Sequence, residues 1–201
     1  MLRVTVDRAL SWEEHISNVV KKCNSILLCL HKIRHHLTPE ARKILIQCHV
    51  FPHILYRLSV WGGAAECHLH RVQKVINFAA RVVSGARVQH HISATVAALG
   101  WRGVRDLVTH RDNIGVFRAL RDPRAPEAIR SLFTSRATVS QRTTGATAAG
   151  MLEPPAFRLS LSRPMFSYRA ASSWNRLPSA ITDSRTRASF VRLLKCTSDN
   201  T

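Results

Sequence analysis

Apolar residues that recur every three or four positions constrain the fold of this chain more than any other feature. Two long segments carry hydrophobic side chains on a single face of a helix with 3.6 residues per turn. The first stripe comprises Ile16, Val19, Cys23, Ile26, Leu27, Leu30 and Ile33, and the second comprises Leu69, Val72, Val75, Ile76, Ala79, Ala80 and Val83. Helices of this kind bury their apolar faces against other elements, so the sequence predicts a mainly α fold.

Helix-terminal residues mark where the first two helices begin. Ser11 followed by Glu14 matches a capping box, in which the two side chains satisfy free backbone amides, so we expect the first helix to begin after Ser11. Thr38 followed by Pro39 predicts the start of a second helix. We expect the buried stripe of this second helix to consist of Ala41, Ile44, Leu45 and Cys48.

The rest of the chain divides into shorter helices, one strand and an irregular region. Helical spacing is found in residues 93–99, 104–120, 128–133, 166–174 and 189–195. Residues 2–6 alternate as a single strand without a partner, and residues 134–150 have the Ser, Thr, Ala and Gly content of a flexible linker. We therefore expect a helical domain, a linker or extended segment, and a poorly ordered C-terminal helical block, at residues 11–133, 134–165 and 166–201.

The chain is strongly basic. Its 201 residues include 30 Lys and Arg against 12 Asp and Glu, a formal net charge of +18 at pH 7. Such a surface attracts polyanions, so the partner we expect is the backbone of RNA or DNA, bound without sequence preference. No apolar run approaches the roughly 18 residues that cross a bilayer, and no secretory signal is visible. Five cysteines without a paired motif favour a reducing compartment, the nucleus or the cytoplasm.

Two groups of basic residues are the candidates for contact with phosphates. The first group lies at the end of the first helix and comprises Lys32, Arg34, His35 and His36. The second group lies on the helix predicted near residues 67–83 and comprises Arg71, Lys74 and Arg81. Each group has an alternative interpretation as an ordinary solvated helix surface, since cations also stabilise the negative end of a helix dipole.

Other chemistry is weakly supported by the sequence. One group of histidines and cysteines includes a Cys-x-x-His spacing that zinc uses elsewhere, but no second ligand pair mirrors it, so we predict no metal site: Cys48, His49, His53, Cys67, His68 and His70. Five aromatic residues could stack on bases, but we predict that they pack in a core instead: Trp61, Trp101, Phe166, Tyr168 and Trp174. No cofactor and no small-molecule substrate are expected.

Several short blocks lie in order along nearly the whole chain: residues 4–7, 10–12, 15–16, 33–34, 52–56, 61–62, 69–74, 79–81, 99–101, 166–171 and 174–178. Together they resemble the reverse transcriptases of non-LTR (LINE-like) retrotransposons. The blocks near the N-terminus resemble the stretch that closes the polymerase palm, and the later ones resemble the helical region and terminal block that follow it.

The resemblance implies a role in target-primed reverse transcription, in which RNA is copied from a nicked DNA end. It implies that residues 1–10 are the remnant of a palm strand and that residues 11–133 are a thumb-like part that grips the template–primer duplex. Such polymerases hold two metal ions with carboxylates that include an Asp-Asp pair, and this sequence has no such pair. We therefore expect a truncated fragment that is not an enzyme on its own.

Two other interpretations remain open at the level of sequence. The helices could serve as a structural or interaction module for a protein partner. The chain could also be a translated pseudogene remnant that folds poorly, because a lone palm strand lacks its neighbours.

Overall fold

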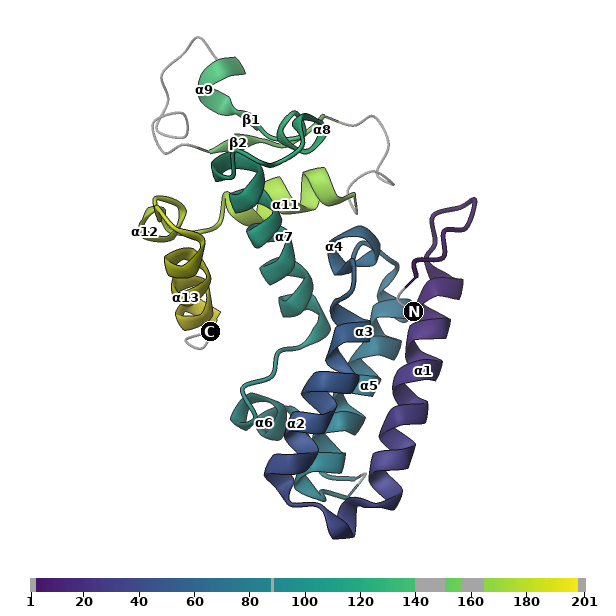
Figure 1. Cartoon of the computed structure of the whole chain (residues 1–201). Helices are drawn as coiled ribbons and strands as arrows, with labels where there is room; N and C mark the ends of the chain where they lie inside the picture. The colour runs from purple at the N-terminus through teal and green to yellow at the C-terminus, as the bar shows by residue number, and fades with distance from the viewer. Residues whose placement is uncertain (1–2, 88, 140–150, 157–164, 199–201) are drawn as a thin grey trace. The chain divides into compact units, whose positions relative to one another are not determined.

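The computed structural model describes residues 3–87, 89–139, 151–156 and 165–198. The fold is mainly helical, as predicted (Figure 1). The chain divides into two compact units, residues 1–108 (unit 1) and residues 109–201 (unit 2). The division falls inside a helix, and the boundary that we expected after residue 133 therefore lies within unit 2.

Unit 1 is built from helices of very different length. Its elements are α1 (Glu13–Lys32), the 3₁₀ turn η1 (Arg34–His36), α2 (Pro39–His49), α3 (Phe51–Leu55), α4 (Leu58–Trp61), α5 (Glu66–Ser84), α6 (Ser93–Ala98) and the start of α7 (Val104–Arg121). As predicted, the second helix begins with Thr38 as its cap, since the Thr38 hydroxyl accepts a hydrogen bond from the amide of Ala41 at 3.2 Å. Gly85 ends α5 in a left-handed conformation (φ 73°) that glycine adopts without strain.

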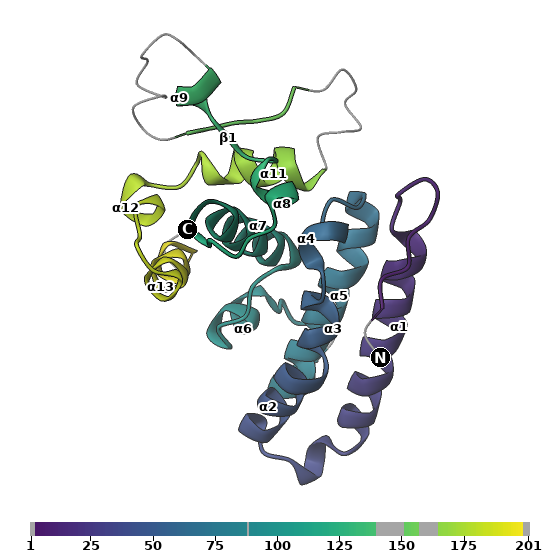
Figure 2. The ribbon, with the colours of Figure 1, turned by 45° about the horizontal axis from the view of Figure 1, so that its top comes forward.

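The long helices α1 and α5 pack side by side and run in the same direction (Figures 1 and 2). Near their starts, Arg71 of α5 donates a hydrogen bond to the hydroxyl of Ser17 of α1 at 3.0 Å. Near their ends, the rings of His31 and Phe78 have centroids 6.1 Å apart. Because α1 and α5 run in the same direction, their C-terminal ends lie together at one end of the unit. The helix α2 packs against both of them.

The two long apolar stripes supply most of the core of unit 1, as their spacing predicted, except that Ile33, the last residue of the first stripe, lies beyond the end of α1 and is 46% exposed. All seven residues of the α5 stripe are buried, and Ile16, Cys23, Leu27 and Leu30 of the α1 stripe are buried with them. Trp61 and Trp101 also lie in this core, which confirms the prediction of core packing for both. None of the described helices combines the length and the hydropathy that a bilayer crossing requires.

The N-terminal segment differs from its predicted structure in two respects. Residues 3–7 form no strand, because they have no neighbouring strand to pair with. Trp12 and not Ser11 is the N-cap residue of α1, although the hydroxyl of Ser11 accepts a hydrogen bond from the amide of Glu13 at 3.3 Å. In place of the predicted capping box, the carboxylate of Asp7 accepts hydrogen bonds from the amides of Ser11 and Trp12, each at 2.9 Å. These bonds, made by a charged acceptor, lower the pKa of Asp7 to about 2.

The buried face of α2 is rotated from the one that we expected. Ile46 is buried and Leu45 packs against the core, whereas Ile44 is 59% exposed and Cys48 is exposed, so only part of the predicted stripe faces the core. Arg42, one helical turn before Ile46, contacts the end of α5. Its guanidinium donates a hydrogen bond at 2.8 Å to the carbonyl of Val82, one of the carbonyls that the end of α5 leaves without a helical partner.

Unit 2 continues from α7 into short helices and a small sheet. Its further elements are α8 (Glu127–Arg130), β1 (Thr134–Ser135), α9 (Arg136–Val139), β2 (Leu152–Glu153), α11 (Phe166–Trp174), α12 (Ser179–Thr182) and α13 (Arg187–Ser198). The described part of the C-terminal block packs into its own core. Phe190 of α13 lies between Phe117 of α7 and Trp174 of α11, with ring centroids 4.4 and 5.6 Å away. The prediction of core packing for Trp174 is therefore confirmed as well.

A buried ion pair joins α7 to α11 inside unit 2. Asp112 is fully buried, and its carboxylate accepts hydrogen bonds from the guanidinium of Arg169 at 2.6 and 3.2 Å. The two-point contact fixes the orientation of both side chains and keeps the buried carboxylate paired with a cation.

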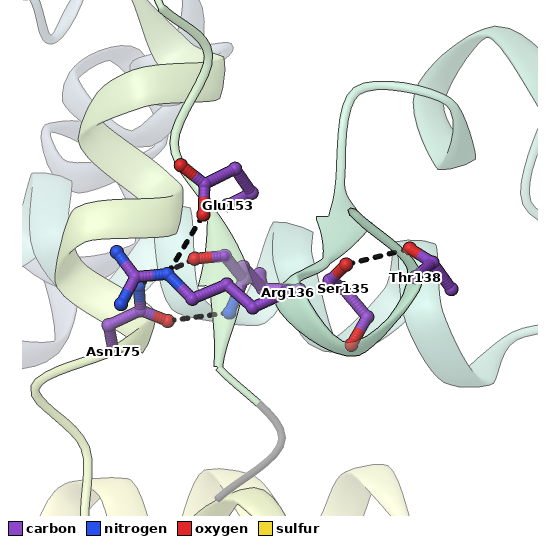
Figure 3. A network of polar contacts seen from close by, with 6 residues as sticks. Ser135, Arg136, Thr138, Glu153 and Asn175 are labelled. Carbon is purple, nitrogen blue, oxygen red and sulfur yellow. Dashed lines mark hydrogen bonds and ion pairs between the residues drawn. The ribbon is translucent and has the colours of Figure 1, made fainter. Parts of the chain in front are cut away.

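Within the predicted linker and extended segment, residues 134–165, the structure describes two short strands and the short helix α9. β1 and β2 pair in antiparallel register, Thr134 opposite Glu153 and Ser135 opposite Leu152. Figure 3 shows Asn175 beside this pair, where its amide side chain donates to the carbonyl of Leu152 at 2.8 Å and accepts from its amide at 2.9 Å. Linker residues 140–150 and 157–164 lie outside the described residues.

Candidate functional site

The first group of predicted basic residues lies where α1 ends. Lys32, His35 and His36 are exposed to solvent, on the last residue of α1 and on η1. The guanidinium of Arg34 turns back to this end, where it donates to the carbonyl of His31 at 3.0 Å and lies 2.7 Å from the His31 ring nitrogen Nε2. The structure therefore keeps all four residues at one helix terminus, as the sequence order requires.

Residues distant in sequence add to this terminus and form a larger basic surface, which we name the basic end. Arg81 is near the end of α5, and its guanidinium donates to the carbonyl of His90 at 3.3 Å. Arg42, held on Val82, brings a further cation from α2. The basic end comprises Lys32, Arg34, His35, His36, Arg42 and Arg81, at the lower end of unit 1 in Figure 1.

Two helix dipoles point their negative ends at this surface. Because α1 and α5 are parallel, the partial negative charges on their last carbonyl groups lie close together, and nearby cations offset them. Neither Lys32 nor Arg34 forms an ion pair with any acidic residue in the described ranges. Their positive charge is therefore available to an external anion after this local compensation.

The second predicted group is not brought together as a row of phosphate contacts. Arg71 is half-buried and donates a hydrogen bond to the hydroxyl of Ser17, near the starts of α1 and α5. Lys74 is exposed one turn later, whereas Arg81 lies at the opposite end of the helix in the basic end. The structure thus assigns Arg71 a role in joining two helices and leaves Lys74 as a solvent-facing cation.

At the end opposite the basic end, unit 1 contains a cavity of 410 Å³, which we name the His15 pocket. Three segments supply its walls: the N-terminal arm, one face of α1, and the end of α3 with the residue after it. The lining residues are Arg3, Thr5, Glu14, His15, Asn18, Val19, Lys22, His53 and Tyr56. The sequence analysis missed this site because its members are separated by up to 53 positions; the only local signal was the helical spacing of His15, Val19 and Lys22.

His15 is the most deeply buried polar residue of the pocket. It is 3% exposed, and burial lowers the pKa of its imidazole. The amide of Thr5 donates to its Nδ1 at 3.4 Å, and its ring meets the ring of Trp61 edge-on at 5.7 Å. Burial also lowers the pKa of His53, with a further contribution from the positive charge of Lys22. Both imidazoles are therefore biased toward the neutral form.

The histidines and cysteines weighed as zinc ligands remain apart. Within the described ranges, no three His, Cys, Asp or Glu side chains converge as a metal site. Cys48 and Cys67 are exposed free thiols, while His53 lies in the His15 pocket.

Two of the aspartates, one in each unit, are committed to structural contacts. Asp7 binds two backbone amides, and Asp112 binds Arg169.

Comparisons of the chain with protein-family models, with curated proteins and with solved structures each found no match.

Proposed function

We propose that this chain is the region that follows the palm in a non-LTR retrotransposon reverse transcriptase, and that it binds the phosphate backbone of RNA or DNA through its basic end. In this proposal the chain does not polymerise nucleotides by itself. It works in the nucleus or the cytoplasm, where its five free cysteines stay reduced.

The observation that carries the binding proposal is the basic end itself. Six cationic or titratable residues from α1, η1, α2 and α5 surround two helix termini, although the sequence separates them by up to 49 positions. Guanidinium and ammonium groups at a surface form charge-assisted hydrogen bonds with phosphate oxygens. Backbone contacts of this kind position a nucleic acid but carry no sequence information, which fits the absence of a base-reading element in the proposal.

The test is a binding titration with duplex DNA and single-stranded RNA at several salt concentrations. Each phosphate that the protein neutralises releases counterions, so the logarithm of affinity falls with the logarithm of salt by about 0.9 per contact on duplex DNA. The double variant Lys32→Ala/Arg34→Ala should lower that slope by about 2.

A matched control removes the same charge from unit 2. Arg185 and Arg192 are both exposed, so Arg185→Ala/Arg192→Ala changes the net charge equally and leaves the basic end intact. If both double variants weaken binding to the same extent, the whole basic surface and not the basic end attracts nucleic acid. Salt-insensitive binding, or none, would remove this part of the proposal.

The claim about polymerisation is tested separately. Extension of a primer by the purified chain with magnesium and deoxynucleotides, free of contaminating enzyme, would contradict it. The physical basis is that two metal ions need neighbouring carboxylates, and the six Asp residues include no adjacent pair.

The outward face of α2 favours a second candidate function, a helical interaction module. Ile44 is 59% exposed and Cys48 lies on the same face one turn later, so an apolar stripe faces solvent where a protein partner would cover it. Capture of a defined partner by the wild-type chain, lost with Ile44→Lys and unaffected by nuclease treatment, would support the module. A cooperative thermal transition followed by circular dichroism would separate both candidates from a poorly folded remnant.

A further inference from the structure

The His15 pocket plays no part in the proposed function, and its chemistry can be considered independently of any retrotransposon origin. It lies at the start of α1, whereas the basic end lies where α1 finishes. Its volume of 410 Å³ falls in the range of about 300–1,000 Å³ typical of small-molecule sites.

The charged groups of the pocket favour an anion. Arg3 from the N-terminal arm and Lys22 from α1 are permanent cations, and Glu14 is the one acidic residue among the lining residues. Lys22 lies close enough to His53 for its charge to lower the pKa of that imidazole. Since His53 tends to the neutral form, the cationic character of the pocket comes from Arg3 and Lys22.

The N-terminal arm, which carries the exposed Arg3, is anchored at the residues that follow Arg3. Two contacts anchor the arm: Thr5 donates its amide to His15, and Asp7 binds the amides of Ser11 and Trp12. In Figures 1 and 2 the arm runs beside the first turns of α1 before it turns back into the helix.

The second observation is an unpaired hydrogen-bond donor. Because Nδ1 of His15 accepts from the Thr5 amide, the neutral ring carries its proton on Nε2. This Nε2 is buried and has no hydrogen-bond partner among the described residues. A buried donor without an acceptor is costly, so an acceptor atom supplied by a ligand would satisfy it.

We propose that the His15 pocket binds a phosphate group, with Arg3 and Lys22 neutralising its charge and the Nε2–H of His15 donating to one of its oxygens. The phenol of Tyr56 and the amide of Asn18 supply further hydrogen-bonding groups on the wall. The cavity is larger than an inorganic phosphate, so it has room for the first atoms esterified to it. Two sources share this chemistry: free phosphate and the terminal phosphate of an oligonucleotide.

Calorimetric titration of the full chain with inorganic phosphate, at constant ionic strength set with chloride, tests the pocket. Lys22→Met should weaken phosphate binding about tenfold, the effect of losing one charge-assisted contact. Lys21→Met is the matched control, because Lys21 is the adjacent exposed lysine on α1 and does not line the pocket. Equal effects of the two variants, or no binding at millimolar phosphate, would overturn the proposal.

A second pair of variants leaves α1 untouched and guards against a folding defect. Arg3 lies in the arm outside any helix and lines the pocket, whereas Arg8 lies in the same arm and does not. Arg3→Met should weaken phosphate binding by about the same factor as Lys22→Met, and Arg8→Met should leave it within twofold, about 0.4 kcal/mol. His15→Phe keeps a ring against Trp61 and removes the donor; undiminished binding by this variant would contradict the role given to Nε2.

Oligonucleotides of one sequence with a 5′-phosphate or a 5′-hydroxyl distinguish the two sources. A preference of about tenfold for the phosphorylated end, lost in Lys22→Met and competed by inorganic phosphate, identifies a terminal phosphate as the ligand. Equal binding of both oligonucleotides, together with Lys22-dependent binding of inorganic phosphate, identifies free phosphate. Failure of both probes refutes the pocket but leaves the basic end, which is tested by its own variants, unaffected.

Discussion

Unit 1 and unit 2 carry the same formal charge, each with 15 Lys and Arg against 6 Asp and Glu, yet they use their acidic residues differently. In unit 2, Asp112, Asp122 and Glu153 each form an ion pair with an arginine of the same unit. In unit 1, Glu66 pairs with Arg105 and Asp7 binds backbone amides, whereas Lys32 and Arg34 at the basic end have no acidic partner in the described ranges. The two units therefore have the same net charge, but more of the acidic residues of unit 2 form ion pairs, and unit 1 gathers cations without an acidic partner at one end.

The cores of the two units also differ in the kind of contact that stabilises them. Unit 1 is held by long apolar stripes that pack helix against helix, with side chains such as Leu27 and Ile76 fully buried. Unit 2 has shorter helices and depends on specific polar contacts, chiefly those of Asp112 and Asn175. Loss of one polar side chain should consequently harm unit 2 more than unit 1.

The largest effect is expected from Arg169→Met, which should destabilise unit 2 and leave unit 1 unchanged. It leaves the fully buried carboxylate of Asp112 without its arginine, so we expect unit 2 to lose about 3 kcal/mol of unfolding free energy. Hydrogen exchange resolved by peptide should show about hundredfold faster exchange in α11 and unchanged exchange in α5.

The control for this prediction is Arg118→Met. Its ion pair with Asp122 spans 4.0 Å and is solvent-exposed on the arginine side, so its loss should cost less than about 1 kcal/mol. Equal acceleration of exchange in α5 and α11 by Arg169→Met would show that the two cores do not respond separately.

A smaller effect is expected from Asn175→Ala. The substitution leaves both the amide and the carbonyl of Leu152, a residue that is 2% exposed, without their side-chain partner. Unsatisfied backbone groups of this kind should lower the unfolding free energy of unit 2 by about 2 kcal/mol. Urea unfolding, followed by signals from unit 2, measures this change.

Arg136→Ala provides the comparison on the same strand pair, since it removes only the exposed ion pair with Glu153 at 2.9 Å (Figure 3). A cost as large as that of Asn175→Ala would contradict the importance given to the Leu152 contact.

The smallest predicted effect lies in unit 1 and depends on pH. The pKa of Asp7 falls from its ordinary value of 3.8 to about 2 because backbone amides donate to its charged form. A lowered folded-state pKa means that this stabilisation is complete above about pH 4 and is lost as the pH falls through about 2. The amides of Ser11 and Trp12 should lose protection from exchange over that interval, and Asp7→Ala should lack protection at every pH. Protection that persists at pH 2 would argue against the carboxylate as its source.

The sequence predicted local features well and distant ones poorly. The α5 stripe was predicted in full because its period is helical and all its members face one core. The face of α2 was predicted only in part: Leu45 packs against the core, but Ile44 is exposed and Ile46, outside the predicted stripe, is buried. Arg42 of the same helix binds the carbonyl of Val82, 40 positions later. Contacts of this length are set by the packing of helices, which periodicity within one helix does not record.

The candidate sites follow the same rule. Lys32, Arg34, His35 and His36 are neighbours in sequence, so their grouping needed no tertiary information. The His15 pocket brings Arg3 from the arm together with His53 from α3, and no sequence motif predicts that these two residues lie close together. Unit 2 was likewise underestimated, because the partners Asp112 and Arg169 are 57 positions apart.

Cys23 differs from the other four cysteines, which are all exposed. It is completely buried, burial raises its pKa to about 12, and its sulfur lies 3.9 Å from the carbonyl of Val50. An alkylating reagent attacks the thiolate, so in the native state it should modify four sulfurs and spare the fifth. The rate at which Cys23 is alkylated therefore reports how often the α1 interface opens, without any engineered probe.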